Sequence, residues 1–347
     1  MIRKTPAPDA PEAPAAADLS ALTVWVLSDG KPGMENQCLG VAEALGVVPV
    51  VKRIVPRFPW SKLPPQLWLN PLDAPGPDGD PVAPPWPDLL IATGRQTVAV
   101  ALAVRKASGR RTFCVQIQNP TMGRRRFDLL AIPKHDRIRG RNVIETDGAL
   151  HRVTAAKLAV EAEKFRPALA HLPRPLVAVL IGGSNAIYRM TPEATRRLAD
   201  GLRALCREHG AGLCVTASRR TGAENEAILR EALKDLPAAM WDGTGDNPYF
   251  GYLGLADAII VTADSVSMVT EACSTGKPVY VVPLEGGSAK FDRFHEGLRA
   301  RGVTRPFEGR LERWTYEPVD DTRRVADAIR LRLDVRRSAI EKRRSGR

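Results

Sequence analysis

Four polar residues follow a short apolar run in the second half of the chain. The run DAIIVTAD (257–264) ends in Asp264, and Ser265, Ser267 and Glu271 come next. A serine or aspartate at a helix start caps the first amide groups, and the remaining amides attract a phosphate. Glu271 lies four residues beyond Ser267, one to two turns into the expected helix, so its carboxylate can accept hydrogen bonds from two sugar hydroxyls. Capping explains the serines but not Glu271, and the spacing predicts a nucleotide site.

Two earlier turns of the same half carry residue types that suit an anion. Each closes an apolar run, LVAVLIGGS (176–184) and GLCVTAS (212–218). The first turn holds Gly182, Gly183 and Ser184, and the second holds Ser218, Arg219, Arg220 and Thr221. Arginine offers a planar fork for two phosphate oxygens, and positive charge is otherwise disfavoured at the helix start expected here. We therefore expect a diphosphate at the second turn rather than a solvated pair of arginines.

A polar turn also closes the first apolar run of the chain. It reads SDGKPGMENQ and contains Ser28, Asp29, Gly30, Lys31, Gly33, Asn36 and Gln37. Glycines at a helix start allow backbone amides to approach an anion. The turn matches neither a dinucleotide fingerprint nor a P-loop, so a tight strand-to-helix connection explains it as well as a ligand does.

Amides and a histidine follow two further runs of the first half. Gln116 and Gln118 alternate in VQIQNP, which would turn both toward one face of a strand. Buried amides need hydrogen-bond partners, and these two either fix the next loop or bind an acceptor. His135, in PKHD, stands at another strand end, where a general base could reach a ligand.

Strands alternate with helices along most of the chain, and the alternation restarts after a proline-punctuated segment near residue 170. Near-continuous apolar runs separated by helices are typical of parallel sheets covered on both faces. We predict an α/β protein with two doubly wound Rossmann-like domains and a cleft between them. The expected parts are a disordered tail (1–20), an acceptor-side domain (21–170), a nucleotide-side domain (171–312), and a C-terminal helix with a basic tail (313–347).

Composition excludes several classes of protein. The 347 residues suffice for two cores. The five cysteines are scattered, without a CxxC pair, and predict a reduced cytosolic protein without zinc or disulfides. The proline- and alanine-rich start lacks the apolar segment of a signal peptide, and no run is long enough for a membrane span.

The formal net charge of +12 is concentrated around residues 110–127 and at the C-terminus. Solvated faces explain most of it, and the absence of interleaved aromatics argues against a nucleic-acid partner. The C-terminal segment has apolar residues at helical spacing, so we expect a helix that packs back across the domains. Its basic end suits anionic lipid at the inner face of a membrane.

Long motifs in the chain resemble those of one known family. They include SDGKPGMENQCLGVAEALG, TFCVQIQNP, FDLLAIPKHD, TASRRT, NPYFGYLGLADAIIVTADSVSMVTEA and GKPVYVVPLEGGSAKFDRFHEGL, and the resemblance covers about residues 22–310. Together they look like the elongated-mitochondria family, whose members are a plant mitochondrial-fission factor and bacterial proteins labelled as nucleotide-sugar enzymes. The second half also resembles the donor half of two-lobed (GT-B) glycosyltransferases.

The resemblance implies roles for particular residues. It implies that Glu271 binds the ribose, that Ser265 and Ser267 hold the nucleotide, and that Gly182, Gly183 and Ser184 lie at the donor diphosphate or the cleft. It assigns Ser218 and Arg219 to phosphate. The loop EGGSAKF departs from the usual transferase loop, yet Gly286, Gly287, Ser288 and Lys290 would still grip a donor sugar or pyrophosphate.

The first function that we expect is a metal-independent glycosyltransferase that uses a nucleoside-diphosphate sugar and acts on a cell-envelope lipid or saccharide. Asp29 and His135 are its candidate bases. The second is a non-catalytic nucleotide-binding or adaptor protein, as the plant relative's role suggests. A third is another nucleotide-sugar enzyme such as an epimerase, although a reductive one would need a dinucleotide turn and a Tyr-x-x-x-Lys pair that the sequence lacks. A bacterial, cytoplasmic protein without a tightly bound cofactor fits all three.

Overall fold

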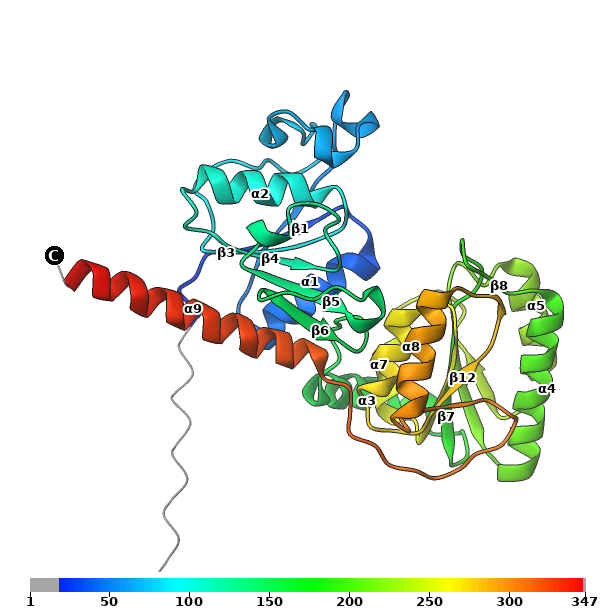
Figure 1. The fold of residues 1–347 in the computed structure, drawn as a ribbon. Helices are drawn as coiled ribbons and strands as arrows, with labels where there is room; N and C mark the ends of the chain where they lie inside the picture. The colour runs from blue at the N-terminus through cyan, green and yellow to red at the C-terminus, as the bar shows by residue number, and fades with distance from the viewer. Residues whose placement is uncertain (1–18, 346–347) are drawn as a thin grey trace, which may run out of the picture.

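Two parallel six-stranded sheets form two lobes (Figure 1). The computed structural model describes residues 19–345, so the predicted N-terminal tail lies outside the described residues up to residue 18. Helices pack on the sheets, and the central strands are apolar and buried because each sheet is covered. The predicted doubly wound α/β class is confirmed.

The first sheet has the strand order β2-β1-β3-β4-β5-β6. Its strands are β1 (Val24–Ser28), β2 (Val50–Arg53), β3 (Leu89–Thr93), β4 (Phe113–Ile117), β5 (Leu129–Pro133) and β6 (Val143–Thr146). Helices α1 (Pro32–Leu45) and α2 (Thr97–Ala107) pack against it. The proline-rich connector after β2 forms the short 3₁₀ helices η1 (Trp60–Lys62), η2 (Pro65–Leu67) and η3 (Pro71–Asp73), and η2 and η3 contact α2. Two more 3₁₀ turns are η4 (Arg124–Arg126) and η5 (Lys134–Asp136).

The second sheet has the order β10-β9-β7-β11-β12-β14. Its strands are β7 (Leu176–Ile181), β9 (Gly212–Ala217), β10 (Ala238–Met240), β11 (Ala258–Thr262), β12 (Val279–Val282) and β14 (Thr304–Pro306). Its helices are α3 (Ala155–Leu169), α4 (Pro192–His209), α5 (Ala223–Leu233), α6 (Tyr249–Leu255), α7 (Val266–Cys273) and α8 (Ala289–Ala300). A short antiparallel pair, β8 (Tyr188–Arg189) with β13 (Glu285–Gly286), joins the loops after β7 and β12.

Each sheet contains one point at which the chain reverses the direction of strand addition. In the first sheet β1 lies between β2 and β3, and in the second β7 lies between β9 and β11. The loops that leave the two central neighbours diverge there, which opens a crevice at the carboxyl ends of the strands. The residues after β1 and β3, and after β7 and β11, therefore occupy the positions where such sheets bind ligands.

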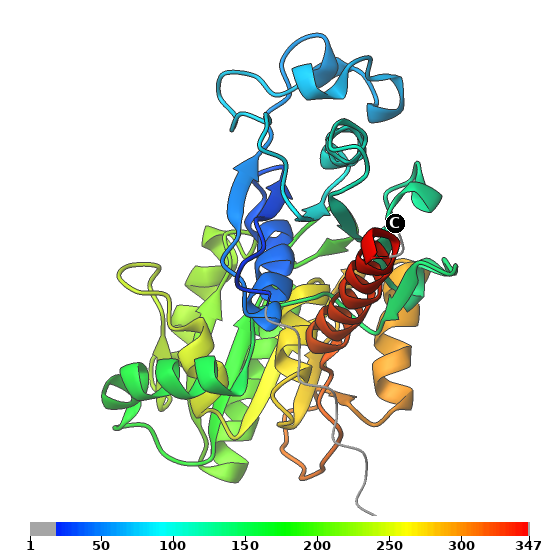
Figure 2. The same cartoon turned by 90° about the vertical axis from the view of Figure 1, so that its left-hand side faces the viewer.

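The last helix, α9 (Asp321–Ser345), returns to the first domain (Figures 1 and 2). Val325, Ile329 and Leu333 join the core that contains α1 and β1. The Asp321 carboxylate accepts hydrogen bonds from the backbone amides of Asp147 at 2.6 Å and Gly148 at 3.0 Å. The expected terminal helix thus crosses from the second domain and completes the core of the first.

All five cysteines are buried and unbonded to one another. Among the described residues, no helix combines the length and the apolar character that crossing a membrane requires.

Candidate functional site

Asp264 holds together three loops at the carboxyl edge of the second sheet. Its Oδ1 accepts a hydrogen bond from the Thr262 hydroxyl at 2.6 Å, and its Oδ2 accepts one from the Gly183 amide at 3.1 Å. The guanidinium of Arg220 pairs with the same Oδ2 at 2.9 Å. Burial raises the pKa of Asp264, while these three donors favour its charged form. The carboxylate therefore fixes the loops after β7, β9 and β11 against one another.

The two glycines after β7 are required by this packing. A Cβ on Gly182 would lie 2.3 Å from both carboxylate oxygens of Asp264. A Cβ on Gly183, whose φ is +141°, would lie 2.1 Å from the carbonyl oxygen of Arg220. Any side chain at either position would push the loops apart.

Some polar side chains in the turns after β7 and β9 have protein partners, and others remain available to a ligand. The Ser218 hydroxyl donates to the Gly182 carbonyl, and the Ser184 hydroxyl accepts from the Met190 amide at 3.0 Å. Arg219 is exposed and has no protein partner within the described part of the chain. Since Arg220 is committed to Asp264, Arg219 is the arginine available to an anion.

Helix α7 begins at this edge, as expected. The Ser265 hydroxyl accepts from the Met268 amide at 3.3 Å and caps the helix. Ser267 is partly exposed in the first turn and forms no hydrogen bond that involves its hydroxyl within residues 19–345. The amino end of α7 and Ser267 thus remain open to a ligand.

Glu271 lies farther along α7, against α6. Its Oε2 accepts a hydrogen bond from the Tyr249 hydroxyl at 2.5 Å. Its Oε1 has no protein partner in the described residues and remains accessible. Burial raises the pKa of Glu271 to about 7, although the Tyr249 hydrogen bond and the charge of Lys157 oppose the rise. Glu271 consequently changes charge near neutral pH.

The loop before α8 links the two domains. Gly286 and Gly287 have φ of +97° and +126°, and Ser288 precedes the helix without capping it. Lys290 pairs with Asp136 of the first domain at 2.8 Å. This ion pair brings the first turn of α8 against η5, the turn after β5, so the carboxyl edges of the two sheets are adjacent.

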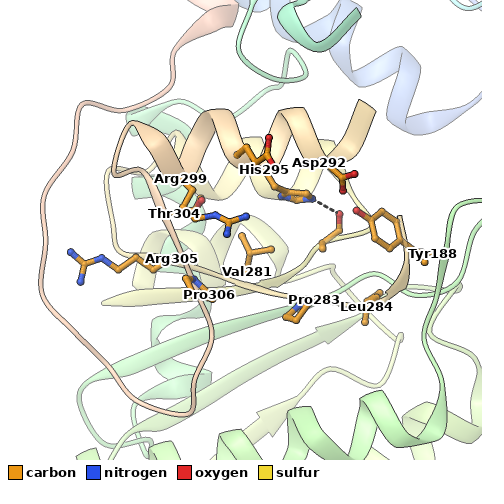
Figure 3. A pocket seen from close by; sticks show the side chains of 13 residues that line it. Tyr188, Val281, Pro283, Leu284, Asp292, His295, Arg299, Thr304, Arg305 and Pro306 are labelled. Carbon is orange, nitrogen blue, oxygen red and sulfur yellow. Dashed lines mark hydrogen bonds between the residues drawn. The ribbon is translucent and has the colours of Figure 1, made fainter. Parts of the chain in front are cut away.

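A cavity of about 410 Å³ lies beneath α8 (Figure 3). Tyr188 and Asp292 stand at one end, and Arg299 and Arg305 stand at the other. His295 points from α8 toward the sheet, and its Nε2 donates to the Ala263 carbonyl at 2.9 Å because a carbonyl only accepts. The predicted Gly286 lines this cavity, whereas the other lining residues were not predicted for the site.

A second cavity of about 410 Å³ lies at the reversal point of the first sheet. It is lined by Asp29, which the sequence predicted as a base, and by Lys31, Gln116 and Gln118, which it predicted for the acceptor or the cleft. Strand β4 ends at Ile117, and Gln118 has φ of +68°. The expectation that Gln116 and Gln118 alternate along one strand and share a face was therefore wrong.

The other residues predicted for this turn do not line the cavity. The Ser28 hydroxyl accepts from the Gly30 amide at 3.1 Å and stabilises the turn itself. The Gln37 amide donates to the Gly33 carbonyl at 3.3 Å within α1, and Asn36 is exposed. A tight strand-to-helix connection accounts for these residues.

His135 lies buried between the domains. Its ring meets the Phe294 ring edge to face, with centroids 5.8 Å apart, and its carbonyl accepts from Arg293 at 3.0 Å. Burial, together with the charge of Lys290, lowers the pKa of His135 to about 4. The residue is 6% exposed, so the geometry favours a packing role over the predicted catalytic one.

Several residues of the site escaped the sequence. Tyr249 and Arg95 carried no pattern of their own, and Asp136 pairs with a residue of the other domain. The signal that could have found Tyr249 is the need of a buried carboxylate for a donor. In residues 19–345, no group of three or more histidine, cysteine, aspartate or glutamate side chains is arranged to hold a metal ion.

Comparison with known proteins settles the lineage. The family model described as mitochondrial fission ELM1 matches residues 32–333. The chain belongs to this family. The ELM1 match begins after β1 and ends within α9, so it contains the reversal point of the second sheet, whereas Asp29 and Lys31 of the first-domain cavity lie before it.

Two curated relatives and one solved structure place this ELM1-family chain further. It is 36% identical over 277 residues to the mitochondrial fission protein ELM1 of Arabidopsis thaliana, a match that covers 72% of the chain and 65% of the plant protein. It is 28% identical over 297 residues to an uncharacterized protein of Rickettsia prowazekii, covering 73% and 81% of the two chains. The UDP-GlcNAc 2-epimerase of Methanocaldococcus jannaschii has a similar fold, with a TM-score of 0.52, 11% identity, and coverage of 88% and 99%.

Proposed function

We propose that this chain binds a nucleoside-diphosphate sugar at the second sheet and transfers the sugar to an acceptor held by the first. The observation that carries the proposal is the loop assembly around Asp264. Arg219 is adjacent to Arg220 of this assembly, the open amino end of α7 follows Asp264 directly, and Glu271, whose Oε1 is free, lies farther along the same helix. Groups that bind an anion, followed along α7 by a carboxylate that binds two hydroxyls, match the diphosphate and ribose of a nucleoside diphosphate.

Each part of the donor has a counterpart. The diphosphate takes the α7 amide groups, Ser267 and Arg219. The ribose hydroxyls donate to the free Oε1 of Glu271. The transferred sugar occupies the cavity beneath α8, where Asp292 accepts from its hydroxyls.

For the transfer step, we assign the general base to Asp29, because its cavity lies at the carboxyl edge of the first sheet. The carboxylate takes the proton of an acceptor hydroxyl while the acceptor oxygen forms a bond to the anomeric carbon. The bond between that carbon and the diphosphate oxygen breaks, and its electron pair leaves with the nucleoside diphosphate.

The test is calorimetric titration with UDP, GDP, CDP and ADP in turn. We expect one nucleotide to bind, Glu271→Gln to weaken it by about 1.5 to 3 kcal/mol, and Arg219→Ala to weaken it by a similar amount. Arg207→Ala, an exposed arginine of α4 with no partner in the described residues, is the matched control and should have no effect. Failure of all four nucleotides at millimolar concentration would refute the donor site.

The name of the plant relative favours a second candidate, an adaptor that kept the fold without turnover. Incubation with a nucleoside-diphosphate sugar that contains the bound nucleotide distinguishes the adaptor from an enzyme. Release of free nucleoside diphosphate in the presence of acceptor extracts indicates a transferase, and isomerised sugar indicates an epimerase. Stable binding without either product indicates the adaptor.

Peripheral contact with anionic lipid is part of the same proposal. Its support is a basic hollow at the opposite side of the first domain, lined by Arg124, Arg125, Arg139, Arg141 and Arg332. Cosedimentation with phosphatidylglycerol vesicles should fall steeply with salt if these arginines bind lipid, and Arg125→Glu together with Arg141→Glu should abolish it.

A further inference from the structure

Two buried oxygens in the first domain have no hydrogen-bond partner. They are Oδ1 of Asp29 and Oε1 of Gln116, and both residues line the cavity at the reversal point between β1 and β3. The side chain of Asp29 is 4% exposed and Gln116 is 1% exposed. A buried acceptor without a partner costs stability, so two in one cavity call for a ligand that supplies donors.

The orientation of the Gln116 amide is fixed by its surroundings. Its Nε2 donates to the Ile117 carbonyl at 3.2 Å. Since a carbonyl cannot donate, the amide nitrogen must take this side, and Oε1 is left as an acceptor. Both unpartnered oxygens can therefore accept hydrogen bonds from hydroxyl or amine groups of a ligand.

The cavity also has positively charged groups that attract an anion. Arg95 is exposed and has no partner in the described chain, and it lies directly before Gln96 and the first residue of α2. No side chain caps α2, and its N-cap residue Gln96 lines the cavity, so the amino end of the helix is next to it. Lys31 pairs with Oδ2 of Asp29 at 2.5 Å, but its side chain is 72% exposed, and such pairs are weak enough for a ligand to rearrange.

Acceptors deep in the wall and cations at the rim point to one class of molecule. We infer that the first-domain cavity binds a phosphorylated polyol of about monosaccharide size. Its hydroxyls donate to Asp29 and Gln116, and its phosphate lies against Arg95, Lys31 and the amino end of α2. A volume of about 410 Å³ suits one sugar ring. The inference rests on the proposed function only in naming this molecule the acceptor.

The first experiment titrates the full chain with glucose 6-phosphate, glucose and inorganic phosphate. We expect glucose 6-phosphate to bind about tenfold or more tightly than either of the others, because each of these lacks one set of contacts. Equal binding of phosphate would overturn the role of the buried acceptors. Equal binding of glucose would overturn the role of the cations, and no binding of glucose 6-phosphate would overturn the site.

Variants separate this site from the nucleotide site. Gln116→Met keeps the side-chain volume and removes the acceptor, so glucose 6-phosphate should bind about tenfold more weakly while nucleoside diphosphate binding is unchanged. Glu271→Gln should have the reverse effect. Arg95→Met, at an exposed position, should reduce the preference for the phosphorylated sugar and tests the cavity even if Gln116→Met fails to fold. If no nucleotide binds but glucose 6-phosphate does, the proposed function fails and the inference stands.

The phosphorylated polyol could be free or the head group of a lipid. Vesicles of phosphatidylcholine with phosphatidylinositol 4-phosphate decide between the two. Vesicle binding that is lost in Gln116→Met identifies a head group. Binding of free glucose 6-phosphate without Gln116-dependent vesicle binding identifies a soluble ligand, and both results support the site.

Discussion

The Tyr249 hydroxyl donates a 2.5 Å hydrogen bond to Oε2 of Glu271. The two residues come from α6 and α7, and the phenol supplies the single protein hydrogen bond that the carboxylate receives among the described residues. The hydrogen bond connects the candidate ribose site on α7 to α6, whose residues line none of the cavities described above. Glu271 is thereby held in place while Oε1 stays free.

The raised pKa of Glu271 predicts a pH dependence of stability. The folded pKa of about 7 lies above the unfolded value of 4.5, so the folded state binds the extra proton between these limits. The contribution is fully present below pH 4.5 and is lost as the pH rises through 7. Relative to Glu271→Gln, the wild type should lose about 3 kcal/mol of unfolding free energy over that interval. Urea denaturation at several pH values measures it, and parallel profiles of the two proteins would contradict the assignment.

Nucleotide binding should show the opposite dependence on pH. Ribose hydroxyls donate to a carboxylate but compete with the proton of a carboxylic acid, so affinity should rise as Glu271 loses its proton around pH 7. Titrations at pH 6 and pH 8 should differ by up to about tenfold in the wild type. Glu271→Gln should bind equally at both, and a pH effect that survives this substitution would place the titrating group elsewhere.

Substitution of Gly182 should destabilise the second domain. The new Cβ in Gly182→Ala would stand 2.3 Å from the Asp264 carboxylate, which is fixed by three donors, and the cost should be about 2 kcal/mol. Gly297→Ala is the control, because nothing lies within 4 Å of its Cβ and it sits inside α8. This control should be neutral or stabilising by up to about 1 kcal/mol. Thermal denaturation of the two variants compares them directly.

The two faces of α9 should respond differently to truncation. Ile329 is fully buried in the first-domain core, so Ile329→Ala should cost about 2 to 4 kcal/mol. Leu331, two residues further along the same helix, is 65% exposed, and Leu331→Ala should change the unfolding free energy by less than about 0.5 kcal/mol. Hydrogen exchange should show lost protection in α1 for the first variant alone. Equal effects would mean that α9 is not docked as described.

The contacts of α8 with the first domain should set how closely the domains associate. Lys290 pairs with Asp136, and Arg301 pairs with Asp147 at 2.7 Å. Loss of both cations in the double variant Lys290→Ala, Arg301→Ala should enlarge the radius of gyration measured by X-ray scattering, and high salt should mimic the effect in the wild type. Arg203→Ala, which breaks a pair within α4, is the control. A radius insensitive to both salt and the double variant would show that other contacts hold the domains.

The fold could be predicted from the sequence because its signals are local. The apolar run 257–264 contains strand β11, and the run that precedes Gly182 forms strand β7. The family could likewise be predicted from long motifs. The β8 and β13 pair could not be predicted, because two-residue strands have no periodicity to detect.

The site was less predictable, because its decisive contacts join distant parts of the chain. The sequence indicated that Arg219 and Arg220 suit an anion, but only the structure shows that Arg220 is neutralised by Asp264. It singled out Gln116 without choosing between a loop tie and a ligand, and the choice depends on which amide atom lacks a partner. Sequence patterns identify residue types at strand ends, whereas pairing among those residues depends on tertiary packing.

The return of α9 to the first domain has a consequence for biosynthesis. Domains usually fold in the order in which they leave the ribosome. Here the earlier domain lacks Val325, Ile329 and Leu333 until α9 is made, whereas the core of the second domain is complete by Val319. The domain that is translated second can therefore finish folding first, and any premature stop before α9 leaves the apolar side of α1 uncovered for chaperones or proteases to find.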